Sequence, residues 1–178
     1  MKKFLKYFHG EHFTKTDLLF TYLGTSLSLI LILVFVYPIE VSIIKHIVLS
    51  FIILDFSGGA IANLTNSTSV FYASRPNLQK IFILAHIVQP IFLAWIFQKE
   101  LITIALTTIY TLISSIVISS LIDFNKQRAL AMMLLLLGII SLLLIFKIET
   151  YLLTICLILY MIKLIFSFPI NWGIITTR

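Results

Sequence analysis

Residues 129–146, ALAMMLLLLGIISLLLIF, decide the fold, because this run of eighteen residues contains no charged side chain. An α-helix rises about 1.5 Å per residue, so the run is close to the length that crosses a hydrocarbon core of about 30 Å. An apolar run this long is typical of a helix that crosses a lipid bilayer. It therefore predicts a transmembrane helix.

Five other runs have the same character and give the chain its predicted architecture, an all-α polytopic membrane protein with a bundle of about six transmembrane helices. Short connectors between the runs predict that neighbouring helices are antiparallel. Residues 1–16 form a separate N-terminal segment, and 17–178 form a single transmembrane domain. The predicted spans are 18–37, 41–64, 78–97, 101–122, 129–146 and 151–169.

Composition supports this class. Of 178 residues, 60% are hydrophobic and only 11% are charged, whereas soluble domains contain about 25% charged residues. The net charge of +6 does not indicate nucleic acid, because the basic residues occur singly at the ends of apolar runs. Cys156 is the one cysteine, so no intrachain disulfide can form and a packing role is favoured.

The distribution of Lys and Arg predicts the orientation. With six spans, nine basic residues lie on one side and three on the other, which by the positive-inside rule makes the first side cytoplasmic. Both termini are then cytoplasmic, in the cell or cytoplasmic membrane. The nine residues are Lys2, Lys3, Lys6, Lys15, Arg75, Lys80, Lys126, Arg128 and Arg178.

The N-terminal segment 1–16 mixes lysines with Phe4, Leu5 and Phe8, which is typical of a segment that lies in the membrane interface. His9 and His12 are too few for a metal site, and a solvated tail is the preferred interpretation. No set of residues elsewhere has metal-ligand spacing, so no metal site is predicted.

Three ionisable residues are predicted to lie at one depth in the bilayer. Counting along each helix places Asp55 roughly 21 Å, Lys163 roughly 20 Å and His86 roughly 18 Å below the outer edge. Gln89 and Tyr160 lie about one turn further out. Because unpaired charges are costly in a bilayer, we expect Asp55 and Lys163 to form a buried pair with His86 nearby.

Two interpretations of that level remain open. A static ion pair would fix how the helices pack, whereas a binding or proton-handling site would use the same groups on a ligand or a proton. The discriminating observation is whether a cavity reaches Asp55.

The span 41–64 adds a polar face, because Asp55, Gly59 and Asn63 are four residues apart. The adjacent Gly58 and Gly59 either allow another helix to approach closely, which we favour, or break the helix. The spans 18–37 and 129–146 lack ionisable side chains and are expected to face lipid or a partner.

In the span 78–97, Pro90 removes the usual hydrogen-bond partner of the His86 carbonyl and predicts a kink beside His86 and Gln89. A structured loop is expected over residues 65–77, which connect this span to the preceding one.

The leading functional hypothesis is a small transporter or a ligand-binding membrane subunit. Its ligand or proton would bind at Asp55, His86, Lys163, Gln89, Asn63 and Tyr160. A membrane-embedded enzyme acting on a lipid or prenyl substrate is the first alternative, and a structural subunit of a membrane complex is the second. The catalytic residues and cofactors of such an enzyme cannot be named from the sequence. The expected partners are the lipid bilayer and a small-molecule or lipid substrate, with a protein partner or a second copy left open, and nucleic acid is not expected.

Overall fold

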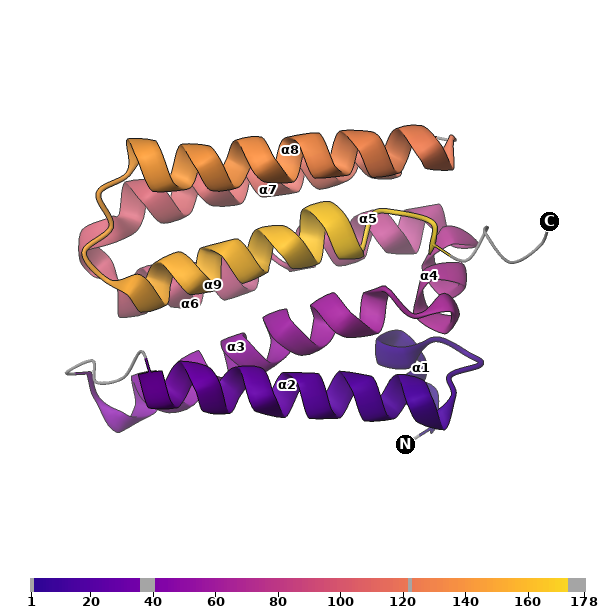
Figure 1. Ribbon diagram of the computed structural model, residues 1–178, viewed down its shortest axis with the longest axis horizontal. Coiled ribbons are helices and arrows are strands. Elements are labelled where there is room, and N and C mark those ends of the chain that lie inside the picture. Colours follow the sequence, from indigo (N-terminus) through magenta and orange to yellow (C-terminus); the bar gives the residue numbers. More distant parts are fainter. Residues whose placement is uncertain (1, 36–40, 122, 173–178) are drawn as a thin grey trace.

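A computed structural model describes residues 2–35, 41–121 and 123–172, and these residues form helices joined by short connectors (Figure 1). No strand occurs in these ranges. The helices are α1 (Lys2–His9), α2 (Lys15–Phe35), α3 (Ile43–Asn63), α4 (Asn66–Ala73), α5 (Pro76–Ala85), α6 (Val88–Ile96), α7 (Leu101–Ser119), α8 (Phe124–Ile145) and α9 (Tyr151–Met161), with a 3-10 turn at Gln98–Glu100 and a π-helical segment at Ile162–Ser167.

Five helical stretches in the described residues are long and apolar enough to cross a membrane, so the chain is an all-helical, multi-pass membrane protein. A sixth apolar helix, Tyr151–Ser167, is shorter. The predicted ends of two spans at Tyr37 and Ile122, and the basic residue Arg178, lie outside the described residues. The five stretches are Lys15–Val34, Ile43–Asn63, Pro76–Ile96, Gln98–Ser119 and Phe124–Ile145.

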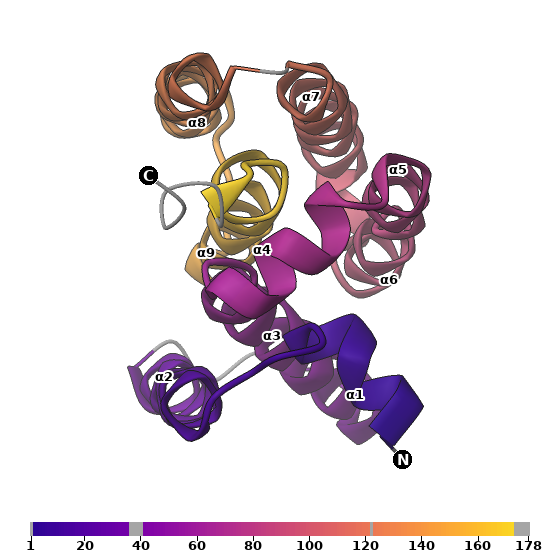
Figure 2. The same ribbon diagram turned by 90° about the vertical axis from the view of Figure 1, so that its right-hand side faces the viewer.

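The long helices run side by side, and α9 lies among them (Figures 1 and 2). Its side chains Leu153, Leu157 and Tyr160 are fully buried, so it forms the centre of the core. Helices α2 and α8 lie at opposite sides of the bundle and expose many Leu and Ile side chains, as expected for surfaces that face lipid. The short helices α1 and α4 cover one end of the bundle.

The connector 65–77, expected as a structured loop, contains a helix. Thr65 is the N-cap of α4, and its hydroxyl accepts a hydrogen bond from the backbone N–H of Thr68 at 3.4 Å. Pro76 then occupies the first turn of α5, where its missing N–H costs nothing. The connector therefore places α4 in contact with both α1 and α5.

The span 78–97 is divided at His86 and Ile87, which join α5 to α6. The position is the one predicted from Pro90. Because the proline cannot donate to the His86 carbonyl, that oxygen is free for another donor, and the Tyr160 hydroxyl donates to it at 3.2 Å.

Helix α3 continues through Gly58 and Gly59, which agrees with the preferred interpretation that the glycines allow close packing. A Cβ atom on Gly58 would lie 2.8 Å from Thr25 Oγ1 of α2. A Cβ atom on Gly59 would contact Lys163, whose Nζ would be 2.8 Å away. The two glycines thus face different neighbours.

Candidate functional site

An ion pair joins α3 to the π-helical segment. Lys163 Nζ lies 2.8 Å from Asp55 Oδ2, and Gln89 Nε2 of α6 donates to the same oxygen at 3.0 Å. The predicted pairing of Asp55 with Lys163 is therefore confirmed. Three elements that are distant in the sequence meet at one carboxylate oxygen.

The two charged side chains differ in exposure. The side chain of Lys163 is 1% exposed, whereas that of Asp55 is 34% exposed. Lys163 reaches the carboxylate by lying across Gly59, where any side chain would block it. A wide π-helical turn begins at Lys163, whose carbonyl accepts from the Phe168 N–H at 3.0 Å. Such turns occur frequently at functional sites.

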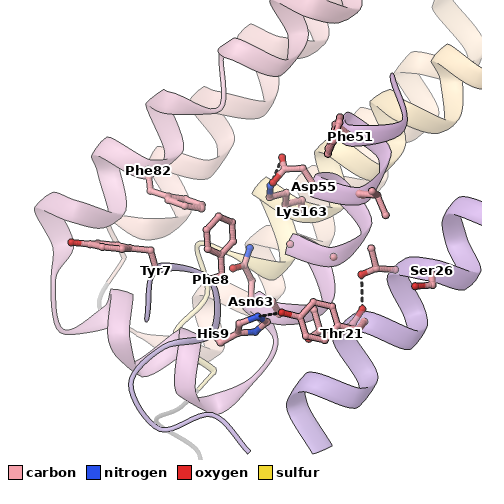
Figure 3. Close-up of a pocket in the computed structure, with 16 residues that line it drawn as sticks. Tyr7, Phe8, His9, Thr21, Ser26, Phe51, Asp55, Asn63, Phe82 and Lys163 are labelled. Carbon is pink, nitrogen blue, oxygen red and sulfur yellow. Dashed lines mark hydrogen bonds and ion pairs between the residues drawn. The ribbon is translucent and has the colours of Figure 1, made fainter. Parts of the chain in front are cut away.

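The exposed side of Asp55 faces a cavity of about 500 Å³ (Figure 3). Its walls are mostly apolar and come from α1, α2 and residues 51–63 of α3, with one residue each from α5 and the π-helical segment. A carboxylate thus lies in the wall of an apolar cavity, with its buried counter-ion behind it. The lining residues are Tyr7, Phe8, His9, Thr21, Tyr22, Thr25, Ser26, Phe51, Leu54, Asp55, Gly58, Gly59, Ala62, Asn63, Phe82 and Lys163.

Helix α1 closes one end of the cavity. The Tyr72 hydroxyl of α4 donates to the carbonyl of Tyr7 at 2.9 Å, and His9 Nε2 is hydrogen-bonded to the Tyr22 hydroxyl of α2 at 3.1 Å. Burial lowers the pKa of His9 from its usual 6.5, so the neutral ring is favoured in this contact. Gly10 ends the helix at a φ of +75° and lies against Ser67, where a Cβ atom would clash with the backbone.

Among the predicted site residues, the structure brings some to the cavity and not others. Asp55, Lys163 and Asn63 line it, and Gln89 contacts it only through Asp55. His86 and Tyr160 are buried beside it: His86 Nδ1 is hydrogen-bonded to the Phe82 carbonyl of its own helix at 2.6 Å rather than to the ion pair.

Sequence reasoning missed the contribution of α1 and α2. Helix α2 was expected to face lipid or a partner, yet Thr21 and Thr25 line the cavity. Their spacing of four residues within an apolar run places both on one helix face, and this is the signal that could have indicated a buried polar side. No comparable signal marks Tyr7 and His9, because their place depends on how α1 docks.

The site offers a carboxylate, an ammonium group and amide groups, which can bind a cation, a proton or a polar headgroup. Within the ranges that the structure describes, no three His, Cys, Asp or Glu side chains are grouped to hold a metal ion. The chain was compared with models of known protein families, with curated proteins and with solved structures, and it matches none of them.

Proposed function

We propose that this chain is a six-span membrane protein with cytoplasmic termini that binds an amphipathic molecule in the cavity, as a small transporter or as the ligand-binding subunit of one. The observation that carries the proposal is the cavity at Asp55. A static ion pair needs no cavity, whereas a binding site does.

The charge arrangement indicates the kind of group that binds. The accessible group at this wall is a carboxylate, because the ammonium of Lys163 is buried behind it. Lys163 and Gln89 both donate to Oδ2 of Asp55, and we propose that Oδ1 meets the ligand. An amine or another cationic group is therefore the expected ligand group at Asp55, with Phe51 on the same cavity wall as apolar surface for its alkyl part.

The path to the cavity supports a ligand that is dissolved in the bilayer. Phe51 lines the cavity and is nevertheless 67% exposed, so one edge of the cavity reaches the outer surface of the bundle. Phe51 lies twelve residues before the end of α3, roughly 18 Å along the helix and inside the apolar span. An amphipathic molecule could enter there from the lipid.

Two features of the bundle fit six spans: the end that the chain reaches after α9, and the short helix Tyr151–Ser167. The end of the bundle that carries α1 and α4 (Figure 1) is also the end that the segment after α9 reaches, since Ser69 of α4 donates a hydrogen bond to the carbonyl of Ile170 at 3.4 Å. Six crossings produce this arrangement, and the positive-inside rule assigns that end to the cytoplasm. The helix Tyr151–Ser167 would then be the sixth span, shorter than the others and surrounded by them.

Decylamine is a suitable probe, because it joins an ammonium group to a single alkyl chain. Binding is measured by calorimetric titration of the protein in phosphatidylcholine nanodiscs, with empty nanodiscs to subtract partition into lipid and decanol as the uncharged control. We expect saturable binding of decylamine and none of decanol.

The matched variants are Asp55→Asn and the double variant Asp55→Asn/Lys163→Met. The double variant removes both charges and so avoids leaving an ammonium group buried without a partner. Loss of decylamine binding in the folded double variant supports the proposal. Equal binding by the double variant and the natural protein, or no saturable binding by either, overturns it.

A further inference from the structure

The end of the cavity near α1 contains a polar group that has no partner. Asn63, the last residue of α3, is 5% exposed, and its Nδ2 atom makes no hydrogen bond to any described residue. Its amide lies among the cavity residues between Phe8 and His9 (Figure 3). Buried amides are nearly always hydrogen-bonded, so this one calls for a partner that the chain does not supply.

A second unpartnered group lies on the facing helix. The hydroxyl oxygen of Thr21 is buried without a hydrogen bond to the described residues, and Thr21 is 5% exposed. Helices α2 and α3 are antiparallel, with Gly24 packed against Ile61. Counting three residues along each helix from that contact places Thr21 at about the level of Leu64, one residue beyond Asn63, and both Thr21 and Asn63 line the cavity.

Thr25, one turn further along α2, shows that the chain can satisfy such a hydroxyl by itself. Its Oγ1 donates to the backbone carbonyl of Thr21 at 2.5 Å, although Thr25 lines the same cavity. Ser57 of α3 likewise donates to the carbonyl of Ile53 at 2.6 Å. Within the described chain, buried side-chain atoms without a partner also occur at Gln89, Thr111, Ser115 and Ser167, but among the residues that line this cavity they are those of Asn63 and Thr21.

We infer that Asn63 and Thr21 form a second polar subsite, which takes a hydroxyl group of the ligand. A hydroxyl both donates and accepts, which suits an amide and a threonine side chain together. This inference rests on the proposed function, in which Asp55 binds an amine. Asn63 follows Asp55 by eight residues, roughly 12 Å along α3. The ligand class is thus a long-chain amino alcohol, polar at both ends and apolar between them.

The cavity between the two subsites fits an alkyl chain. The backbone faces of Gly58 and Gly59 line it on α3, and the rings of Phe8 and Phe82 come from α1 and α5. Burying an alkyl chain there is favourable, with about 0.8 kcal/mol per buried CH₂ as the usual magnitude. A chain too short to span the distance cannot reach both polar ends.

The test compares decylamine with the amino alcohol of the same chain length, in phosphatidylcholine nanodiscs of the full chain. We expect the amino alcohol to bind about tenfold more tightly, the usual effect of one buried hydrogen-bonding group. Asn63→Leu and Thr21→Val should each remove that preference, which is measured as the ratio of the two ligands' affinities for the same variant. Thr25→Val is the matched control and should retain the preference, because its hydroxyl already has a partner.

The outcomes separate the two proposals. If decylamine shows no saturable binding to the natural protein, the proposed function is wrong, and so is the subsite that rests on it. If decylamine binds and the amino alcohol binds no better, or if Asn63→Leu keeps the preference, the subsite is wrong and the proposed function stands. Thermal unfolding without ligand adds a second readout: a ligand-binding amide predicts that Asn63→Leu unfolds at a higher temperature, and a structural amide predicts a lower one.

Discussion

The buried ammonium group of Lys163 and the partly exposed carboxylate of Asp55 form one ion pair with two unequal partners. Removing Asp55 leaves an ammonium group with 1% exposure, whereas removing Lys163 leaves a carboxylate that can meet water or ligand in the cavity. The energetic effect of each substitution depends on which charge remains. The two substitutions should therefore lower the free energy of unfolding by different amounts, whereas a symmetric, fully buried pair would give similar losses.

We expect Asp55→Asn to destabilise the fold by about 3–5 kcal/mol, the range for a broken buried ion pair. Lys163→Met should destabilise it by less, about 1–2 kcal/mol, because a solvated carboxylate needs less compensation. The double variant Asp55→Asn/Lys163→Met should recover much of the loss. The measurement is the free energy of unfolding in mixed detergent and SDS micelles.

A reversed order, with Lys163→Met the more damaging substitution, contradicts the asymmetric description. Gln89→Leu serves as a comparison, because it removes the second donor to the same carboxylate oxygen without removing a charge. Its effect should be about 0.6 kcal/mol, the average for a side-chain hydrogen bond between membrane helices.

At the residue scale, depth in the bilayer was enough to predict the pairing of Asp55 with Lys163, because a charge in lipid needs a counter-charge at its own level. The same count predicted that His86 would lie nearby, but not that its ring would bond to its own helix. The unpartnered state of Thr21 and Asn63 could not be predicted. It depends on the rotamers of the two side chains, which in turn depend on how the helices pack together. The sequence pattern does not determine that packing.

At the element scale, helix α3 both packs against α2 and lines the cavity. Gly58 and Gly59 are adjacent, so they point about 100° apart on an α-helix, given 3.6 residues per turn. One therefore meets α2 through Thr25, and the other meets Lys163. Each glycine therefore makes room for a different side chain, and a substitution at one serves as the control for a substitution at the other.

We predict that Gly59→Ala displaces Lys163 from Asp55 and destabilises the fold by about 1–3 kcal/mol, the usual magnitude of overpacking. In a Lys163→Ala background the same substitution should have little effect, because the side chain it meets is gone. Gly58→Ala is the matched control. Its cost should persist in the Lys163→Ala background and diminish with Thr25→Ala. A double-mutant cycle on unfolding free energies measures both, and additivity of Gly59→Ala with Lys163→Ala would contradict the assignment.

The positions of the long helices were largely predictable because apolar runs mark them. Helix α4 was not predicted, for a physical reason. Residues Asn66–Ala73 are rich in Asn, Ser and Thr, which are weak helix formers. The cap at Thr65 and the docking of Tyr72 onto α1 stabilise α4 instead. The break at His86 was predictable because proline acts on a fixed neighbour, the carbonyl four residues earlier.

At the scale of the whole molecule, the arrangement follows from where polar groups can lie in lipid. The central helix α9 and its π-helical extension hold Lys163 among buried side chains, and the outer helices α2 and α8 present aliphatic surface. One exception is the inner face of α2, where threonines line the cavity. The site thus lies between the central helices and an outer helix, next to the surface that faces lipid.

The orientation of the bundle is the last prediction, and single cysteines can measure it. In a Cys156→Ala background, which removes the one native thiol, Asn125→Cys and Lys147→Cys place a thiol at the two ends of α8, where both residues are exposed. Six spans with cytoplasmic termini predict that a membrane-impermeant maleimide added to intact cells labels position 147 and not position 125. Position 125 should react only after the membrane is permeabilised. The opposite pattern would reverse the orientation and place the end of the bundle that carries α1 and α4 at the exterior. A fluorescent reporter fused after residue 178 completes the test, since five spans would place it on the opposite side of the membrane from α1, and six would place both on the same side.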